Sequence, residues 1–344
     1  MSKTAIISKR IRLARNLKDY PFPCRMSYAE SEDVVNKVWQ VLEHSDIGGG
    51  FTLSRLNEAD VIDRQSLVEA HLISPEIAAN EHRLCVAAAI SKDGEISVMI
   101  NEEDHIRIQV FSKTNSINDC LEKAREVDKA LEILDYAVNS EYGYLTACPT
   151  NVGTGMRVSV MMHLPALVAT KQISSIIEAC NRLNIEVRGL YGEHSNPDGN
   201  MFQLSNQITL GQSEEEFVVM VSRISEQLDK RETDLRERLY KEDRVRFEDR
   251  VARSYGIFAN ARVMSGKEAL QLMSDIRMGI DLGILDMSAE LLAEIDQLVQ
   301  PATLQKYAGK EMNPTERDIV RADVIREKIK NGSVSHSEND NEVV

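Results

Sequence analysis

The sequence lacks several features that would point to common protein classes. Its five cysteines, at positions 24, 85, 120, 148 and 180, form no CxxC pair and no metal-ligand spacing with the seven histidines, so neither a disulfide framework nor a zinc site is expected. No apolar run approaches the roughly 20 residues needed to span a bilayer, and the first residues are too polar for a secretory signal. These absences predict a cytoplasmic protein with no membrane association.

Positive charge is scarce as well. The net charge of −14 disfavours direct binding to nucleic acid. Basic residues cluster near the start of the chain, at Lys9, Arg10, Arg12, Arg15 and Lys18. This cluster indicates an anion-binding site within an acidic protein. The sequence has no GxxxxGK[ST] loop, no His-Arg-Asp loop and no Asp-Phe-Gly, so the common ATP-binding motifs are excluded.

The stretch from Tyr144 to Leu164, YLTACPTNVGTGMRVSVMMHL, is the most informative part of the chain. It combines Cys148, a Pro-Thr-Asn turn, a Gly-Thr-Gly segment and Arg157 before an apolar run. The turn residues end one strand, the glycines are expected to bring backbone close to a ligand, and the apolar run fixes the loop to the core. A rigid scaffold presents a binding site in this way.

Hydrophobic periodicity predicts an α+β fold. Alternation marks strands at residues 8–13, 84–90, 95–100 and 105–111, while helical spacing marks residues 30–44, 57–72, 118–139, 165–183 and 213–250. Beyond residue 250 only helical patterns occur. We therefore expect an antiparallel sheet flanked by helices in a catalytic domain at 1–250, a small all-helical domain at 251–330 and a disordered tail at 331–344.

Arginines recur at strand and loop positions with apolar neighbours. In the strand Ser-Lys-Arg-Ile-Arg-Leu, the period of two puts Ser8, Arg10 and Arg12 on one face. Arg107, Arg157 and Arg188 occupy similar positions. Any one of them alone is more often a surface residue or half of a salt bridge, but a set of guanidinium groups suits the bidentate binding of phosphate.

These motifs together resemble those of the phosphagen (guanidino) kinases, which move phosphate between ATP and a guanidine nitrogen. SKRIR, NEEDHIRI, CPTNVGTGMR and VRG are similar to four motifs of that family. The resemblance implies a guanidino-kinase fold, Mg²⁺ held through ATP, and an ATP site formed by Ser8, Arg10, Arg12, His71, Arg107, Arg157 and Arg188. For His71 the alternative is an ordinary residue at a helix end.

The acceptor side requires carboxylates, because a guanidinium is no nucleophile until a base removes a proton. Glu103 is expected on the same alternating face as Arg107, about 13 Å away at ~3.3 Å per residue. Glu193 lies in a glycine-rich loop that can close over the acceptor. The resemblance makes Glu103 and Glu193 the acidic clamp and Cys148 a thiolate beside the guanidinium; the alternatives are a solvated carboxylate and a small buried hydrophobe.

The C-terminal segment NPTERDIVRADVIREKI resembles a phosphoarginine-binding motif of one branch, the bacterial protein arginine kinases of the McsB type. The matching residues are Arg317, Asp318, Arg321 and Ala322, and the simpler interpretation is a solvated helix face with charge pairs. That branch implies phosphorylation of arginine side chains in proteins, a homodimer, an McsA-type activator and delivery of marked proteins to the ClpC–ClpP protease.

Two other functions stay open. One is a kinase for free arginine or another small guanidine. Members of the family that act on small molecules carry a helical domain before the first phosphate-binding strand, whereas that strand begins here at residue 8, which argues against this function. The other is a non-catalytic adaptor that binds phosphoarginine. The presence of Glu103, Glu193 and five arginines argues against the adaptor.

Overall fold

An eight-stranded antiparallel sheet forms the centre of the fold in the computed structural model, which describes residues 4–79, 83–189 and 198–339. The strand order is β2-β3-β4-β5-β1-β8-β10-β9. The strands are β1 (Ile6–Arg15), β2 (Phe51–Arg55), β3 (Ala87–Ser91), β4 (Ile96–Ile100), β5 (Ile106–Ser112), β8 (Met156–His163), β9 (Ile185–Gly189) and β10 (Met201–Asn206). A separate small hairpin consists of β6 (Val138–Asn139) and β7 (Gly143–Tyr144).

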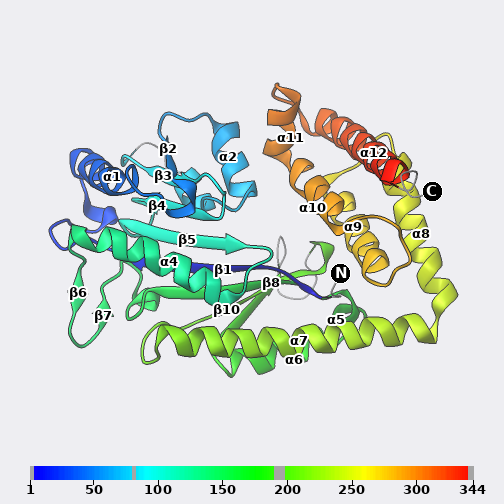
Figure 1. Ribbon diagram of the computed structural model, residues 1–344, viewed down its shortest axis with the longest axis horizontal. Coiled ribbons are helices and arrows are strands. Elements are labelled where there is room, and N and C mark those ends of the chain that lie inside the picture. Colours follow the sequence, from blue (N-terminus) through cyan, green and yellow to red (C-terminus); the bar gives the residue numbers. More distant parts are fainter. Residues whose placement is uncertain (1–3, 80–82, 190–197, 340–344) are drawn as a thin grey trace.

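Helices cover one face of this sheet and a helical unit stands at its end (Figure 1). The helices on this face are α1 (Tyr28–Leu42), α4 (Ile117–Leu131), α5 (Pro165–Ala169), α6 (Ile173–Asn181) and α7 (Glu214–Glu242), whereas α2 (Val61–Glu69) and α3 (Pro75–Ala78) lie beside the other face, where they line a cavity with Arg10 and Arg12. The C-terminal unit is α8 (Arg244–Asn260), α9 (Gly266–Asp281), α10 (Ala289–Leu298), α11 (Pro301–Ala308) and α12 (Pro314–Asn339). The predicted α+β architecture is confirmed.

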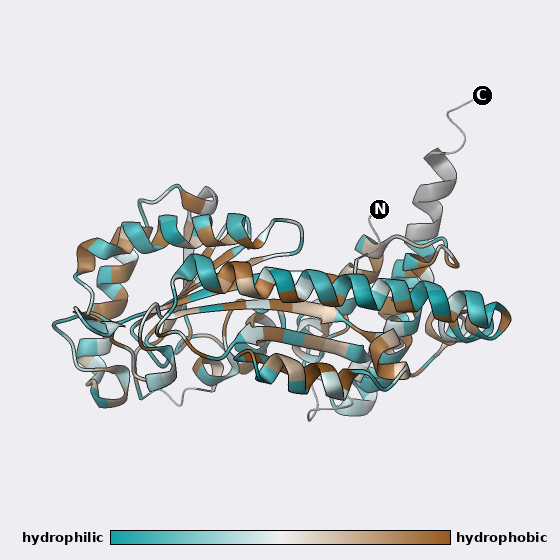
Figure 2. Ribbon diagram, turned by 90° about the horizontal axis from the view of Figure 1, so that it is seen from below, coloured by the Kyte–Doolittle hydropathy of each residue, from teal (hydrophilic) through white to brown (hydrophobic). Residues whose placement is uncertain are grey.

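The alternation in β1 explains how the sheet acquires two different faces. Ile11 and Leu13 are fully buried against α4 on the helix side, where burial of each side chain contributes about 2 kcal/mol. Arg10 and Arg12 lie on the opposite face. Seen from the helix side, the long helix α7 is largely hydrophilic, whereas the strands behind it are mostly hydrophobic (Figure 2). The uncovered face is therefore left for polar chemistry.

Three predicted helices are shorter than expected because local backbone geometry ends them. The helix expected over 118–139 gives way to a 3-10 turn and stops at Asp135, which has φ 58°. The one expected over 165–183 is broken at Lys171, with φ 58°. Such left-handed residues interrupt the helical hydrogen-bond ladder. The long helix expected over 213–250 divides at Asp243, whose side chain caps α8 by accepting from Arg246 N.

The C-terminal unit has a hydrophobic core of its own, which includes Phe258, Ile276, Ile295 and Ile325. Its last helix continues to Asn339, whereas we expected disorder from residue 331. Once a helix is nucleated, each added residue gains a hydrogen bond, so polar residues can extend one that packing holds upstream. Residues 340–344 lie outside the described part of the chain. None of the described helices is both long and apolar enough to cross a membrane.

Several polar contacts dock this unit on the rest of the protein, and two of them involve partly or fully buried charged side chains. Glu69 at the end of α2 accepts hydrogen bonds from the backbone nitrogens of Ala302 and Thr303, each 2.7 Å long, and so caps α11. Arg236 on α7 donates to Asp281 on α9 over 2.6 Å and to Glu232 over 2.7 Å. The unit is thereby held close to the uncovered face of the sheet.

Candidate functional site

A row of arginines occupies the uncovered face of the central strands. In the antiparallel register, Arg12 on β1 lies opposite Arg157 on β8 and Gln109 on β5, so all three side chains share one face. Arg107 lies one step further along, opposite Ala14, and Arg10 one step back, opposite Ser159. The structure thus gathers four arginines that come from three separate motifs of the sequence.

Arg12 is the least compensated of them. It makes no hydrogen bond or ion pair with any described residue, and its Nε is buried without a partner. Burial lowers the pKa of Arg12 well below its ordinary value, and the charges of Arg10, Arg107 and Arg157 lower it further, whereas the charge of Glu102 opposes this shift only in part. Burial and the Arg157 and Arg107 charges likewise lower the pKa of Arg10 to about 10. Positive charge held in this way favours a bound polyanion.

Arg10, Arg157 and Arg188 have partners within the sheet. Arg10 Nη2 donates to Gln203 Oε1 over 2.8 Å, and Arg157 Nη2 donates to Glu186 Oε2 over 2.5 Å. Arg188 is paired with the other oxygen of Glu186 at 2.5 Å. The sequence analysis missed Glu186, although its position two residues before Arg188 in a strand puts both on one face.

The segment from Asn101 to His105 is a tight turn and not an extended strand. Asn101 has φ 61°, and its backbone nitrogen donates to the carbonyl oxygen of His105 over 2.9 Å. The expected separation of about 13 Å between Glu103 and Arg107 is therefore wrong. Arg107 Nη2 lies 3.0 Å from Glu103 Oε2, and Arg107 Nη1 lies 2.7 Å from Glu102 Oε1.

Other residues of this motif are structural. Asp104 Oδ1 accepts from Asn16 Nδ2 at 2.6 Å and from Ala147 N at 2.7 Å, which ties the turn to the loop before Cys148. His105 Nδ1 accepts from Leu17 N, so its Nε2–H donates to the carbonyl of Pro21. These bonds leave Glu102 and Glu103 directed toward the arginines.

Glu103 combines access with an altered acidity. Its side chain is 45% exposed, whereas that of Glu102 is 3% exposed. Partial burial raises the pKa of Glu103, and the charge of Arg107 opposes this rise. A cavity of about 950 Å³ is lined by Glu103, Arg107, Arg12 and Arg10. A carboxylate with a raised pKa beside a cluster of guanidinium groups is a candidate general base.

Cys148 and the glycine loop lie next to this turn. Cys148 is half-buried, and its Sγ lies 2.9 Å from Thr150 Oγ1. Packing within the protein already requires both glycines, and the expected approach of their backbone to a ligand stays a prediction. A Cβ on Gly153 would lie 2.3 Å from the carbonyl oxygen of Thr209, and one on Gly155 would lie 2.6 Å from that of Ala14. The loop therefore packs against the ends of β1 and β10.

His71 and Ser8 lie at the far end of the arginine row. The His71 ring centroid is 5.9 Å from that of Phe111, and both residues line a second cavity together with Ser8 and Arg10. Burial and the charges of Arg10 and Lys113 lower the pKa of His71 to about 4, so the imidazole is neutral at pH 7. Glu193, the second predicted carboxylate, lies outside the described residues.

The predicted basic cluster near the start divides between the two faces of the sheet. Arg15 is fully buried on the helix side, where Nη2 pairs with Asp128 at 2.7 Å and the guanidinium carbon lies 3.6 Å from the Tyr144 ring centroid. Lys9 donates to the carbonyl of Asn115. These odd-numbered residues therefore support the fold, and Arg10 and Arg12 alone of the cluster face the candidate site.

Comparison with known proteins agrees with this geometry. Residues 33–235 match the model of the ATP:guanido phosphotransferase C-terminal catalytic domain, and residues 244–342 match that of the protein-arginine kinase McsB C-terminal domain. The protein-arginine kinase of Bacillus subtilis (strain 168) is 46% identical over 328 residues, which cover 94% of this chain and 90% of that protein. The chain belongs to the protein-arginine kinase family.

A second sequence relative and two solved structures are similar to this chain as well. The protein-arginine kinase of Geobacillus sp. (strain WCH70) is 49% identical, with the same coverage of both chains. Among solved structures, the duplicated taurocyamine kinase from Schistosoma mansoni with bound transition state analog components has a TM-score of 0.59 and 26% identity, covering 65% of this chain and 32% of that one. Lombricine kinase has a TM-score of 0.58 and 23% identity, covering 68% and 67%.

The predicted phosphoarginine-binding residues lie on α12, away from the arginine row. Arg321 is 2% exposed; it pairs with Asp318 at 2.5 Å and donates to the carbonyls of Met264 and Val299. Ala322 is buried as well. The simpler interpretation of a solvated helix face therefore does not hold for Arg321 and Ala322, which the helix turns toward the core, and phosphoarginine binding by the four residues stays a prediction. Arg317 and Asp318 remain partly exposed.

Proposed function

We propose that the arginine row and Glu103 transfer the γ-phosphoryl group of ATP to the guanidinium group of arginine side chains in other proteins. The observation that carries this proposal is that Arg12, whose buried Nε has no hydrogen-bond partner among the described residues, lines the same cavity as Glu103, a partly exposed carboxylate of raised pKa. Membership of the protein-arginine kinase family supports the same acceptor.

The chemistry follows from these positions. The triphosphate lies along Arg10, Arg12, Arg107 and Arg157, which spread the charge of the transferred group. Glu103 takes a proton from a guanidinium nitrogen, that nitrogen bonds to the γ-phosphorus, and the bond from phosphorus to the β,γ-bridging oxygen breaks to release ADP. Cys148 contacts and polarises the acceptor guanidinium, and Glu193 is assigned to its other side.

Substrate binding exchanges ion-pair partners at Arg107. In the free protein Arg107 is neutralised by Glu102 and Glu103. When phosphate takes the place of these carboxylates on Arg107, Glu103 becomes available to the acceptor guanidinium. Each substrate thereby prepares the site for the other, which predicts that ATP tightens binding of the acceptor.

Magnesium fits this site as a companion of the nucleotide. Among the described residues there is no group of three or more His, Cys, Asp or Glu side chains placed to hold a metal ion. The arginines that face the site bind phosphate oxygens and not cations, and the two carboxylates beside them, Glu102 and Glu103, are paired with Arg107. Mg²⁺ is therefore assigned to the oxygens of ATP and water, where it neutralises part of the phosphate charge.

The remaining expectations concern partners. A homodimer through the C-terminal unit is supported by exposed apolar side chains at Val245, Ile257 and Val263, which are 77%, 47% and 56% exposed. Light scattering of a Val245→Glu and Ile257→Glu variant should show a monomer. The McsA-type activator, delivery to ClpC–ClpP, allosteric phosphoarginine binding and the cytoplasmic location rest on the family resemblance and the sequence.

The decisive experiment is incubation of the purified protein with Mg-ATP and casein, a loosely folded acceptor, followed by mapping of phosphosites under non-acidic conditions because the P–N bond is acid-labile. We expect phosphoarginine on the acceptor with the native protein and none with Glu103→Gln. A parallel incubation with free arginine tests the small-molecule alternative. Binding of phosphoarginine without any transfer would favour the adaptor.

A further inference from the structure

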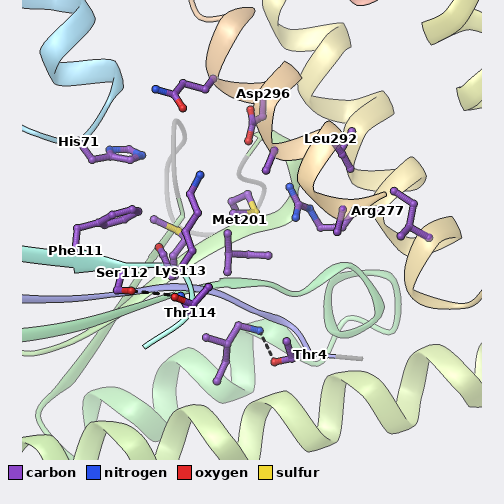
Figure 3. Close-up of a pocket in the computed structure, with 18 of the residues that line it drawn as sticks. Thr4, His71, Phe111, Ser112, Lys113, Thr114, Met201, Arg277, Leu292 and Asp296 are labelled. Carbon is purple, nitrogen blue, oxygen red and sulfur yellow. Dashed lines mark hydrogen bonds between the residues drawn. The ribbon is translucent and has the colours of Figure 1, made fainter. Parts of the chain in front are cut away.

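A second and larger cavity adjoins the arginine row. It has a volume of about 1340 Å³ and lies between the catalytic sheet and the C-terminal helical unit (Figure 3). Arg10 and His71 line this cavity and also the smaller one that contains Glu103 and Arg107. The two spaces are therefore neighbours along one continuous path.

The order of residues on β1 sets the direction of a nucleotide in this path. Arg107 lies opposite Ala14 and contacts Glu103, so the transferred phosphate belongs at that end. From Ala14 back to Arg10 is about 13 Å at ~3.3 Å per residue. A triphosphate that starts beside Glu103 and follows Arg12 to Arg10 leaves its nucleoside pointing past Ser8 into the larger cavity.

The helical unit contributes two charged side chains to this cavity. Arg277 on α9 and Asp296 on α10 both point into it in Figure 3. Arg277 makes no hydrogen bond or ion pair with any residue of the described part of the chain. Asp296 Oδ1 accepts one long hydrogen bond, 3.4 Å, from Gln300 Nε2 on the next helical turn. Both groups retain most of their capacity to bind a ligand.

Both charged side chains lie where burial disfavours a charge that no partner or ligand compensates. Burial lowers the pKa of Arg277 and raises the pKa of Asp296, and these shifts persist although the charge of each group opposes the shift of the other and Asp281 also acts on Arg277, so each charge is poorly solvated. A direct ion pair between them would be the simple structural explanation. However, no nitrogen of Arg277 lies within 4.0 Å of an oxygen of Asp296 in the described structure, so the space between them can admit a polar ligand.

We propose that Arg277 and Asp296 bind the nucleoside half of ATP, so that the C-terminal helical unit completes the nucleotide site of the catalytic domain. The assignment rests on the proposed function, which puts the triphosphate on the arginine row. Asp296 accepts hydrogen bonds from hydroxyl or amino groups of the nucleoside, and Arg277 donates to its acceptors. His71 and Phe111 form the aromatic wall on the catalytic side, where a base can stack.

The test compares ADP with inorganic tripolyphosphate by isothermal titration calorimetry on the full chain. In Asp296→Asn and Arg277→Gln the dissociation constant for ADP should rise about 10-fold or more, because each loses a charge-assisted hydrogen bond. Tripolyphosphate affinity should stay within two-fold. Glu290→Gln, an exposed carboxylate on the same α10, is the matched control and should bind both ligands normally. Arg12→Gln should weaken both ligands.

Further measurements keep the result interpretable. Circular dichroism and thermal unfolding show whether each variant is folded, and Arg277→Lys, which keeps the charge, should recover part of the ADP affinity. In the kinase assay the variants should raise KM for ATP several-fold while kcat stays within two-fold. A merely structural role would lower kcat and stability together.

Unchanged ADP affinity in both folded variants would overturn the assignment, as would equal weakening of ADP and tripolyphosphate. These outcomes differ from failure of the proposed function. If the variants lose affinity for ADP but not for tripolyphosphate, and the native protein transfers no phosphate to arginine, the proposed function fails and the nucleoside assignment stands. If it phosphorylates arginine and the variants bind ADP normally, the assignment alone fails.

Discussion

Replacing Arg12 by methionine should stabilise the empty protein and abolish its tight binding of ATP. The guanidinium of Arg12 has a buried Nε without a partner and lies among Arg10, Arg107 and Arg157, whose charges repel it. Methionine keeps a straight apolar side chain but removes the charge and the unpaired donors. The native residue is therefore expected to serve the ligand at the expense of the free fold.

The size of both effects can be worked out. Leaving a buried polar group unpaired costs about 1–3 kcal/mol, and two unit charges ~8 Å apart repel by about 2 kcal/mol at an effective dielectric constant of ~20. We expect a gain of about 1–3 kcal/mol in the free energy of unfolding, which raises the melting temperature by roughly 3–8 °C. Loss of a charge-assisted bond to phosphate costs about 1.5–3 kcal/mol, or roughly a 10- to 150-fold loss of ATP affinity.

Arg15→Met on the same strand provides the matched control. Arg15 faces the other side of the sheet and pairs with Asp128, so its replacement leaves a buried carboxylate uncompensated and should cost about 3–5 kcal/mol. Differential scanning fluorimetry without nucleotide measures stability, and calorimetry with ADP measures binding. If Arg12→Met melts below the native protein, or if both variants lose stability equally, the interpretation of Arg12 as an uncompensated ligand-binding charge is wrong.

Three further predictions follow from the same contacts. Glu103→Gln should lower kcat by about 10²–10⁴-fold in the casein assay, whereas Cys148→Ser should retain measurable turnover; an equal loss would contradict their different roles. The pKa of His71 in the folded protein is lowered to about 4, so between pH 6.5 and 4 the imidazole takes up a proton only in the unfolded chain. The free energy of unfolding should therefore fall by about 3 kcal/mol as the pH falls through this range. Urea unfolding at several pH values should show a smaller loss for His71→Asn. Glu69→Ala should destabilise the docking of α11 by about 1–2 kcal/mol, seen as faster amide exchange at Ala302 and Thr303 and slow exchange retained in β1.

The sequence was sufficient for the features that depend on local periodicity. Alternation in β1 correctly predicted that Arg10 and Arg12 share one face and that Ile11 and Leu13 face the core. The capping box at Ser213 agrees with the predicted start of the long helix. The helix ends at Asp135, Lys171 and Asp243 could not be predicted, because single residues with unusual backbone angles decide them and none is a glycine or proline.

The pairing of charges depends on tertiary structure and was largely beyond the sequence. The turn at Asn101–His105 is held by Asn16, Ser31 and Cys85, which come from distant segments. That turn brings Glu103 to within 3.0 Å of Arg107. Sequence spacing treats the same residues as an extended strand, so the predicted distance between Glu103 and Arg107 was wrong, and their roles as acceptor carboxylate and phosphate-binding arginine stay predictions.

Arg12 and Arg15 show what distinguishes a functional arginine from a structural one. Both are basic residues of one strand with apolar neighbours, and composition cannot separate them. The odd position puts Arg15 against α4, where Asp128 and Tyr144 satisfy it, and the even position puts Arg12 among like charges on the uncovered face. The chain is rich in carboxylates, so a partner for Arg12 could have been provided if the residue served only the fold. The absence of any described partner for Arg12 is therefore best explained by a ligand that supplies the negative charge.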